Sequence, residues 1–340
     1  MSQQPSSPSQ PSRSSAGRWI FLFVKIAVSL GLLVLLFRQT DISAVGERMR
    51  AMDLRWMAAA LGVYGTMIAV SAWRWRVLIE TQQVDCSIGH LVNSFLVATF
   101  FNNFLPSNIG GDVIRIADTA PLMASRTRAT AVVFIDRGLG LVALMLVAAL
   151  GSAAAARNGM DFPGSEYLWI ALGGTVLAAM PPLFAPRLVF LALSPLKRLG
   201  NAWVDERVHR LSDLLARLNE RPVAIAQAFV GAIAVQLILV SFYAAVARGL
   251  DIPLTFEGAL LVVPVSLVVQ MVPLSINGFG VREAVFTYFF KKLGLSVDAA
   301  LALSLISTAT IAVFSLSGGL VFLLRRGGLS PAPLPSDSSQ

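Results

Sequence analysis

Two short segments of the sequence carry proline, glycine and charged residues in the same order. The segments are Pro106–Arg115 and Pro273–Glu283, and in both an arginine lies nine positions after the proline. Gly111 matches Gly278 in the same register. Glycine lets a backbone turn and approach a ligand, and a helix that restarts after the turn offers free amides and the positive end of its dipole to an anion. The repeated pattern therefore predicts a site for an anion such as phosphate.

The charged side chains of these segments would complete that site. Arg115 and Arg282 could both donate paired hydrogen bonds to the same phosphate or pyrophosphate group. Asp112 and Glu283 would then hold the arginines or titrate. The alternative is structural, with each arginine pairing with its neighbouring acid and holding its segment closed. We favour the ligand role for the arginines, because charged residues at membrane depth usually serve function.

The composition is that of a membrane protein. Of the 340 residues, 56% are hydrophobic and 14% are charged, and the mean hydropathy is +0.71. Soluble domains are roughly one-quarter charged. The net charge of +8 does not indicate a nucleic-acid partner, because the basic residues lie between apolar runs without interleaved aromatic motifs. The single cysteine, Cys86, excludes an intramolecular disulfide, and the two histidines lie far apart, so we expect no metal site and no cofactor.

Several apolar stretches are long enough to span a bilayer, which takes about 20 residues. Six qualify, namely Trp19–Phe37, Trp56–Trp73, Thr130–Leu150, Tyr167–Phe184, Val223–Ala247 and Ala299–Leu324. Two shorter stretches, 91–105 and 259–274, run into the proline and glycine segments. If both turn back, the arginine-rich stretch 197–221 stays in the cytoplasm, as the positive-inside rule favours, although Arg38 and Arg55 then lie outside. We predict an all-α polytopic membrane protein with about six full spans and two re-entrant hairpins.

The two hairpins would enter from opposite sides, which is the geometry of an inverted repeat. We predict a transmembrane domain over 18–326, with halves 18–196 and 222–326 joined by an amphipathic helix over 201–221. The apolar residues of that helix recur at helical spacing and predict a membrane-surface linker; they are Val204, Val208, Leu211, Leu215 and Leu218. Residues 1–17 and 327–340 are rich in serine and proline and are predicted to be disordered tails, the first of them cytoplasmic.

Further polar residues in the apolar runs are candidates for the same site. Asn102, Asn103 and Asn277 could contact a headgroup or cap the broken helices. Asp136 and Arg137 are expected to form an intrahelical or interhelical ion pair that faces the cavity, and the run Trp73–Arg76 is typical of an interfacial anchor. We predict no catalytic or metal-binding residue. The predicted substrate-binding residues are Asn103, Pro106, Gly110, Gly111, Asp112, Arg115, Asp136, Arg137, Asn277, Gly278, Gly280, Arg282 and Glu283.

These motifs resemble those of the flippase-like transmembrane family, the module found at the N-terminal side of lysylphosphatidylglycerol synthases. The matching features are Asn103–Pro106 running into Gly110–Arg115, then Asp136–Gly138, and then Pro273–Glu283. The resemblance covers nearly the whole of residues 18–326. It implies a transporter-like fold with re-entrant hairpins that moves a lipid across the bilayer, and its cargoes would include aminoacylated phospholipids, polyprenyl-linked glycans or other lipids.

The sequence departs from the family pattern at three positions. Asp112 stands where glutamate is common, and Ser107 and Asn108 stand where a more basic or glycine-rich stretch is expected. The headgroup preference therefore stays open. Because no acyltransferase-like domain follows residue 326, we do not extend the resemblance to lipid aminoacylation, and we expect the chain not to be an enzyme.

We therefore predict a secondary transporter that moves a lipid with an anionic phosphate headgroup across the cytoplasmic membrane of a bacterium. The sequence has no phosphate-loop motif, so the driving force would come from the lipid gradient or from protons through Asp112, Asp136 or Glu283. One alternative is an intramembrane lipid-modifying enzyme, which the scarcity of clustered carboxylates disfavours, and another is a non-transporting accessory subunit. The expected partner is the membrane lipid, and the oligomeric state stays open, a dimer included.

Overall fold

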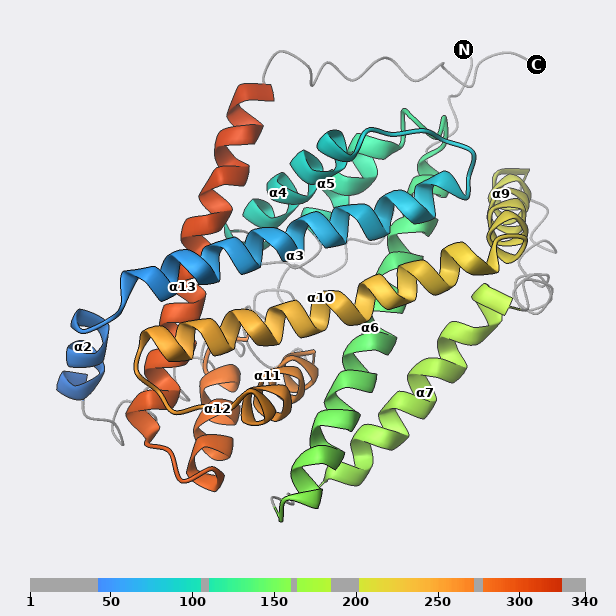
Figure 1. Cartoon of the computed structure of the whole chain (residues 1–340). Helices are drawn as coiled ribbons and strands as arrows, with labels where there is room; N and C mark the ends of the chain where they lie inside the picture. Colours follow the sequence, from blue (N-terminus) through green and yellow to red (C-terminus); the bar gives the residue numbers. More distant parts are fainter. Residues whose placement is uncertain (1–41, 105–109, 160–163, 185–201, 272–277, 326–340) are drawn as a thin grey trace, which may run out of the picture.

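The structure is a computed structural model in which long and short helices form one bundle (Figure 1). It describes residues 42–104, 110–159, 164–184, 202–271 and 278–325. Over these ranges the chain contains helices and no β-strand, which confirms the all-α prediction. The predicted span Trp19–Phe37, the two predicted tails, Pro106 and Asn277 lie outside the described residues.

The helices follow one another through short connections. In chain order they are α2 (Ile42–Arg50), α3 (Leu54–Glu80), α4 (Ile88–Phe104), α5 (Gly110–Thr119), α6 (Arg126–Arg157), α7 (Ser165–Phe184), α9 (Ala202–Asn219), α10 (Pro222–Gly249), α11 (Phe256–Gln270), α12 (Val281–Lys292) and α13 (Val297–Leu324). Serine caps begin two of the long helices. The Ser125 hydroxyl, before α6, and the Ser296 hydroxyl, before α13, each accept a hydrogen bond from the backbone amide three positions ahead, at 3.3 Å in both cases.

Four of the described helices are long and apolar enough to cross a membrane. They are α3, α6, α10 and α13, with 27, 32, 28 and 28 residues. These helices contain four of the six predicted spans, and the 20-residue helix α7 contains the predicted stretch Tyr167–Phe184. The chain is therefore a polytopic α-helical membrane protein, and the total of six crossings stays a prediction.

The helix order repeats at the spacing that separates Pro106 from Pro273, which is 167 residues. Shifted by this spacing, α3, α4, α5 and α6 overlie α10, α11, α12 and α13 in turn. We call α3–α6 the first repeat and α10–α13 the second repeat. The shift also places α2 on α9, so each repeat is preceded by a helix of its own.

The first helices of the two repeats, α3 and α10, run in opposite directions. The amide of Asp53, just before α3, donates a hydrogen bond of 2.9 Å to the carbonyl of Gly249, the last residue of α10. Near the other end of the pair, the ring of Trp73 lies against Gly231. Helices α3 and α10 are therefore antiparallel neighbours (Figure 1). Such a pair is related by a twofold axis that crosses the bundle, which is the arrangement expected of an inverted repeat.

Each repeat contains one pair of short helices. Helices α4 and α5 have 17 and 10 residues and pack together, and α11 and α12 have 15 and 12 and also pack together. At about 1.5 Å per residue these helices rise roughly 15 to 26 Å, less than the roughly 30 Å of a hydrocarbon core. The first pair opens where α3 ends and the second where α10 ends, so the pairs open at opposite ends of the bundle. These lengths favour hairpins, and their depth in a membrane stays a prediction.

The repeats are joined by close helix packing at matched glycines. Helix α4 packs on α13 of the other repeat, and α11 packs on α6. A Cβ added at Gly318 would overlap the carbonyl of Leu96, and one added at Gly151 would overlap the carbonyl of Leu260. The two glycines are themselves 167 residues apart. A glycine at the matched position therefore lies at a close backbone approach in both interfaces, although the partner carbonyls differ by one helical turn.

Polar contacts at matched positions close the same two interfaces. The side-chain amide of Asn158, after α6, donates to Glu257 of α11 at 3.2 Å. Arg325, which lies 167 positions after Asn158, donates to the carbonyl of His90 in α4 at 3.4 Å and also to Asp118 of α5 at 3.0 Å. The two ends of the bundle are thus held by equivalent residues of different type.

The predicted linker helix lies against protein. Helix α9 contacts α6, α7 and α10, and it lies at the end of the bundle opposite α2 (Figure 1). Its residues Leu214, Leu215 and Leu218 are buried in a core cluster with side chains of α3, α4 and α6. Leu215 and Leu218, two of the residues expected on the membrane-facing side, are therefore covered by protein, and the position of α9 at a membrane surface stays a prediction.

We expect Gly318→Ala and Gly151→Ala to lower the temperature of unfolding, because an added methyl group forces apart two helix backbones. Overpacking of this kind costs about 1–3 kcal/mol. The measurement is size-exclusion chromatography of the detergent-solubilised protein after heating. Gly173→Ala on α7 is the matched control, because open space surrounds that glycine. A Gly318→Ala protein that melts with the unaltered chain would contradict the assigned contact.

Candidate functional site

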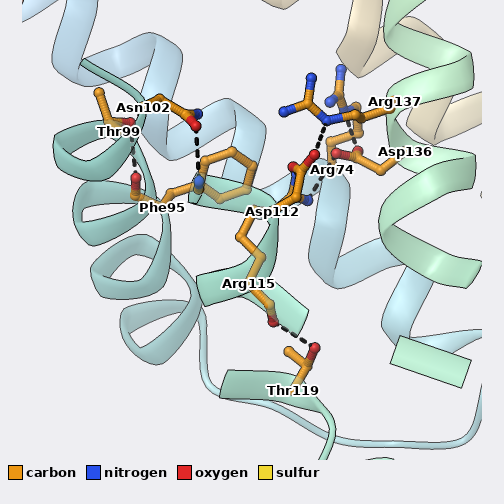
Figure 2. Close-up of polar contacts among 10 residues, drawn as sticks. Arg74, Phe95, Thr99, Asn102, Asp112, Arg115, Thr119, Asp136 and Arg137 are labelled. Carbon is orange, nitrogen blue, oxygen red and sulfur yellow. Dashed lines mark hydrogen bonds and ion pairs between the residues drawn. The ribbon is translucent and has the colours of Figure 1, made fainter. Parts of the chain in front are cut away.

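A buried carboxylate links three helices of the first repeat. Asp136 of α6 accepts hydrogen bonds from Nε of Arg74 in α3 at 2.7 Å and from a terminal nitrogen of Arg115 in α5 at 2.8 Å (Figure 2). Its side chain is 1% exposed, and those of the two arginines are 8% and 6% exposed. Each carboxylate oxygen therefore holds one guanidinium. We call Arg74, Asp112, Arg115, Asp136 and Arg137 the first-repeat cluster.

Aromatic rings fix the position of Arg115. Its guanidinium carbon lies 4.2 Å from the ring centre of Trp75 and 4.2 Å from that of Phe95. Both rings offer the negative face of their π-system to the cation, which stabilises a guanidinium removed from water. The Nε of Arg115 is buried without a hydrogen-bond partner among the described residues. Arg115 is therefore held by Asp136 and packs against two aromatic rings that are themselves in edge-to-face contact.

The exposed part of the cluster is the ion pair between Arg137 and Asp112. Arg137 of α6 contacts Asp112 of α5, and their side chains are 47% and 16% exposed. Asp112 also lies 3.9 Å from a terminal nitrogen of Arg115, which is the long limit of an ion pair. Asp136 and Arg137 thus form ion pairs between helices, each with a different partner. Of the two kinds of ion pair considered, intrahelical and interhelical, these contacts are of the interhelical kind.

The start of α5 is built on a glycine and an asparagine. The amide of Gly111 donates to the side-chain oxygen of Asn102 in α4 at 2.8 Å (Figure 2). A Cβ at Gly111 would overlap the Asn102 side chain and the carbonyl of Ala98, so glycine is required at this close approach. Of the two roles considered for Asn102, the structure supports the helix cap. Asn103 is exposed on α4, and Gly110 is the first residue of α5.

The second repeat holds its own arginine in an equivalent place. Arg282 donates to Ser304 of α13 at 2.8 Å and to Glu283 at 2.9 Å, and it also interacts with Tyr243 of α10. Glu283 is 0% exposed and accepts a further hydrogen bond from the Ser304 hydroxyl at 2.7 Å. We call Tyr243, Arg282, Glu283 and Ser304 the second-repeat cluster. It ties the second short helix of its pair to the long helices on either side, as Arg115 does in the first repeat.

Two glycines with positive φ precede α12, the helix that carries Arg282 and Glu283. Gly278 and Gly280 have φ of +78° and +84°, a region that other residues rarely adopt. The amide of Gly280 donates to the second oxygen of Glu283 at 2.6 Å, so one carboxylate caps the helix and holds the arginine. The glycines predicted from the motif therefore shape the backbone at the start of α12.

Arg115 and Arg282 have separate partners in this structure, Asp136 for the first and Ser304 and Glu283 for the second, and a phosphate shared by both arginines stays a prediction. The ring of Tyr64 in α3 lies 5.4 Å from that of Phe242, the neighbour of Tyr243, and Tyr64 precedes Arg74 by ten positions. Ten helical residues separate the two clusters by about 15 Å along the bundle.

Arg74 is the site residue that the sequence analysis missed. The run Trp73–Arg76 is wrong as a simple interfacial anchor, because Arg74 and Trp75 are buried at 7% and 0% exposure. The position of Arg74 on the buried face of the predicted helix could have identified it. Tyr64, Ile68 and Ser71 form the buried stripe of α3, and Arg74 lies one turn further along the helix from Ser71.

The two clusters differ in charge. Among the described residues, the first-repeat cluster contains three arginines and two aspartates, so it carries one unbalanced positive charge. The second-repeat cluster contains one arginine and one glutamate and is balanced. Excess charge in a low-dielectric region is costly unless an anion compensates it. The first-repeat cluster is therefore the candidate anion site.

Fold and site together define a multi-pass membrane protein built from two antiparallel repeats, each with a buried arginine cluster. The family described as the lysylphosphatidylglycerol synthase TM region matches residues 22–319. The chain belongs to this family, which confirms the resemblance found in the motifs. No curated protein matches the chain.

Removing the acid at the centre of the cluster tests its structural role. Asp136→Asn removes the charge of the carboxylate that both buried guanidiniums contact, and we expect a loss of about 3–5 kcal/mol in the free energy of unfolding. Adding Arg74→Met to that variant should recover part of the loss, because one of the two cations is removed. Unfolding in a denaturing detergent, followed by circular dichroism, measures the difference. Asp213→Asn, an exposed acid of α9, is the control, and strictly additive losses at Asp136 and Arg74 would contradict the pairing.

Proposed function

We propose that the protein is a secondary, flippase-like transporter that moves a lipid with an anionic phosphate headgroup across the cytoplasmic membrane of a bacterium. The observation that supports this most directly is the formal charge of +1 of the first-repeat cluster, which has buried Arg74, Arg115 and Asp136 and a half-exposed Arg137 beside helices long enough to span a membrane. The family supports a role with lipids. A phosphodiester headgroup is a monoanion, and it would neutralise the excess charge that the cluster carries.

In this proposal the headgroup contacts Arg137, the most exposed cation of the cluster, while the acyl chains stay in the bilayer. Arg115 and Arg74 act through Asp136 and fix the position of α5 against α6. The two short-helix pairs open at opposite ends of the bundle, so movement of one repeat against the other could expose the site to each side in turn. The driving force is the lipid gradient or a proton, and nucleotide hydrolysis takes no part.

Lipid movement by the purified protein in liposomes tests the proposal. A membrane-impermeant reductant bleaches labelled headgroups in the outer leaflet, so the fraction bleached reports movement between leaflets. We expect labelled phosphatidylglycerol to move at least about tenfold faster with the protein than without it, and Arg137→Ala to remove most of that gain because the headgroup loses its cation. Arg157→Ala is the matched control, since that arginine is exposed at the far end of the same helix.

Repeating the assay with a panel of labelled lipids also separates the competing functions. The panel should contain anionic and zwitterionic phospholipids and a polyprenyl-phosphate lipid. Movement of every lipid at the same rate, insensitive to Arg137→Ala, would contradict a headgroup site. Chemical conversion of a lipid without movement would favour an intramembrane enzyme, and neither movement nor conversion by folded protein would favour an accessory subunit.

A further inference from the structure

Asp112 lies between two arginines that belong to different parts of the cluster. It contacts Arg137 of α6 and stands 3.9 Å from a terminal nitrogen of Arg115 in its own helix (Figure 2). The second distance is too long for a hydrogen bond. A change in the Asp112 side-chain rotamer would therefore exchange one partner for the other without moving the backbone.

We infer that Asp112 is an internal competitor of the substrate anion: a phosphate monoanion displaces it from Arg137, and the released carboxylate pairs with Arg115. This inference rests on the proposed function and adds how the site distinguishes its occupied and empty states. Arg137 exchanges one carboxylate for one phosphate. Asp112 exchanges one guanidinium for another.

The charges of the cluster support this exchange. Without a ligand, Asp136 is shared by Arg74 and Arg115, and Asp112 contacts Arg137 while it stands 3.9 Å from Arg115. The Nε of Arg115 has no hydrogen-bond partner among the described residues. A bound monoanion brings the cluster from one excess positive charge to neutrality. No ion is then left buried without a partner, which is the condition for low cost in a low-dielectric site.

The exchange would also change which helices are connected. The contact between Arg137 and Asp112 joins α6 to α5 at the exposed side of the cluster, whereas the bond between Arg115 and Asp136 joins the same helices inside it. Binding of the anion opens the outer connection and leaves the inner one. The second-repeat cluster has no such alternative, because its acid and arginine are adjacent in one helix and both are buried.

The chemistry recognised is a phosphate monoanion, either on a lipid headgroup or free in solution. Binding can be measured with radiolabelled dihexanoyl phosphatidylglycerol and the full chain in phosphatidylcholine nanodiscs. Inorganic phosphate and dihexanoyl phosphatidylcholine serve as competitors. Competition by inorganic phosphate would show that the phosphate group is sufficient for recognition. Competition by the lipid but not by inorganic phosphate would show that acyl chains are also needed. Either result is compatible with the exchange, and each identifies whether the recognised phosphate is free or part of a lipid.

We expect Asp112→Asn to bind labelled phosphatidylglycerol at least about fivefold more tightly, the effect of removing a partly exposed competing charge. Asp112→Glu keeps the competitor and should stay within about twofold of the unaltered chain by the same reasoning. Arg137→Gln should weaken binding, and adding Asp112→Asn to it should give no gain. Asp112→Ser removes the same charge and replaces the asparagine variant if that variant fails to fold.

Two results would overturn the inference while leaving the proposed function standing. One is unchanged or weaker binding by folded Asp112→Asn protein when Arg137→Gln does weaken binding. The other is a gain from Asp112→Asn that persists in the Arg137→Gln background. Absence of binding to the unaltered chain would instead overturn the proposed headgroup site, and the inference with it.

Discussion

The first repeat depends on one buried carboxylate. Asp136 holds a guanidinium on each oxygen and thereby ties α3 and α5 to α6. Three charges removed from water remain stable only when each is paired and hydrogen-bonded, because desolvation costs several kcal/mol per ion. The aromatic rings of Trp75 and Phe95 supply the rest of the compensation for Arg115. The end of the short helix α5 that carries the motif is thus positioned by electrostatics as much as by apolar packing.

The second repeat meets the same constraint with different residues. Arg282 occupies the position of Arg115, but its acid is the next residue along the chain, and α13 contributes the neutral Ser304 where α6 contributes charged groups. The duplicated backbone preserves the place of the arginine and the close glycine contacts, while the charge balance has diverged. Symmetry of the fold therefore does not imply symmetry of function.

Much of the architecture could be predicted from the sequence because a membrane imposes length and composition on each span. The repeat was visible in the matched proline, glycine and arginine positions, since a chain break among apolar helices needs those residue types. The pairing of Asp136 and Arg137 across helices was also within reach. The role of Arg74 was not, because two flanking tryptophans mark an interface equally well, and only α6 packing on α3 brings Asp136 to it. The interhelical partners of Arg115 and Arg282 were not within reach of the sequence either, because only the packing of α6 on α5 and of α13 on α12 brings those partners to them.

The difference between the clusters bears on which repeat responds to a ligand. In the second-repeat cluster every charge has its partner inside the cluster, so an incoming anion would have to break a buried pair and leave Glu283 without a cation. In the first-repeat cluster the acid nearest the surface has two arginines within reach, so an anion can enter without leaving any charge unpaired. For a bound anion to displace a carboxylate and leave every charge paired, the site needs one more cation than it has acids. The first-repeat cluster meets that condition, and the balanced second-repeat cluster is suited to holding its helices in one arrangement.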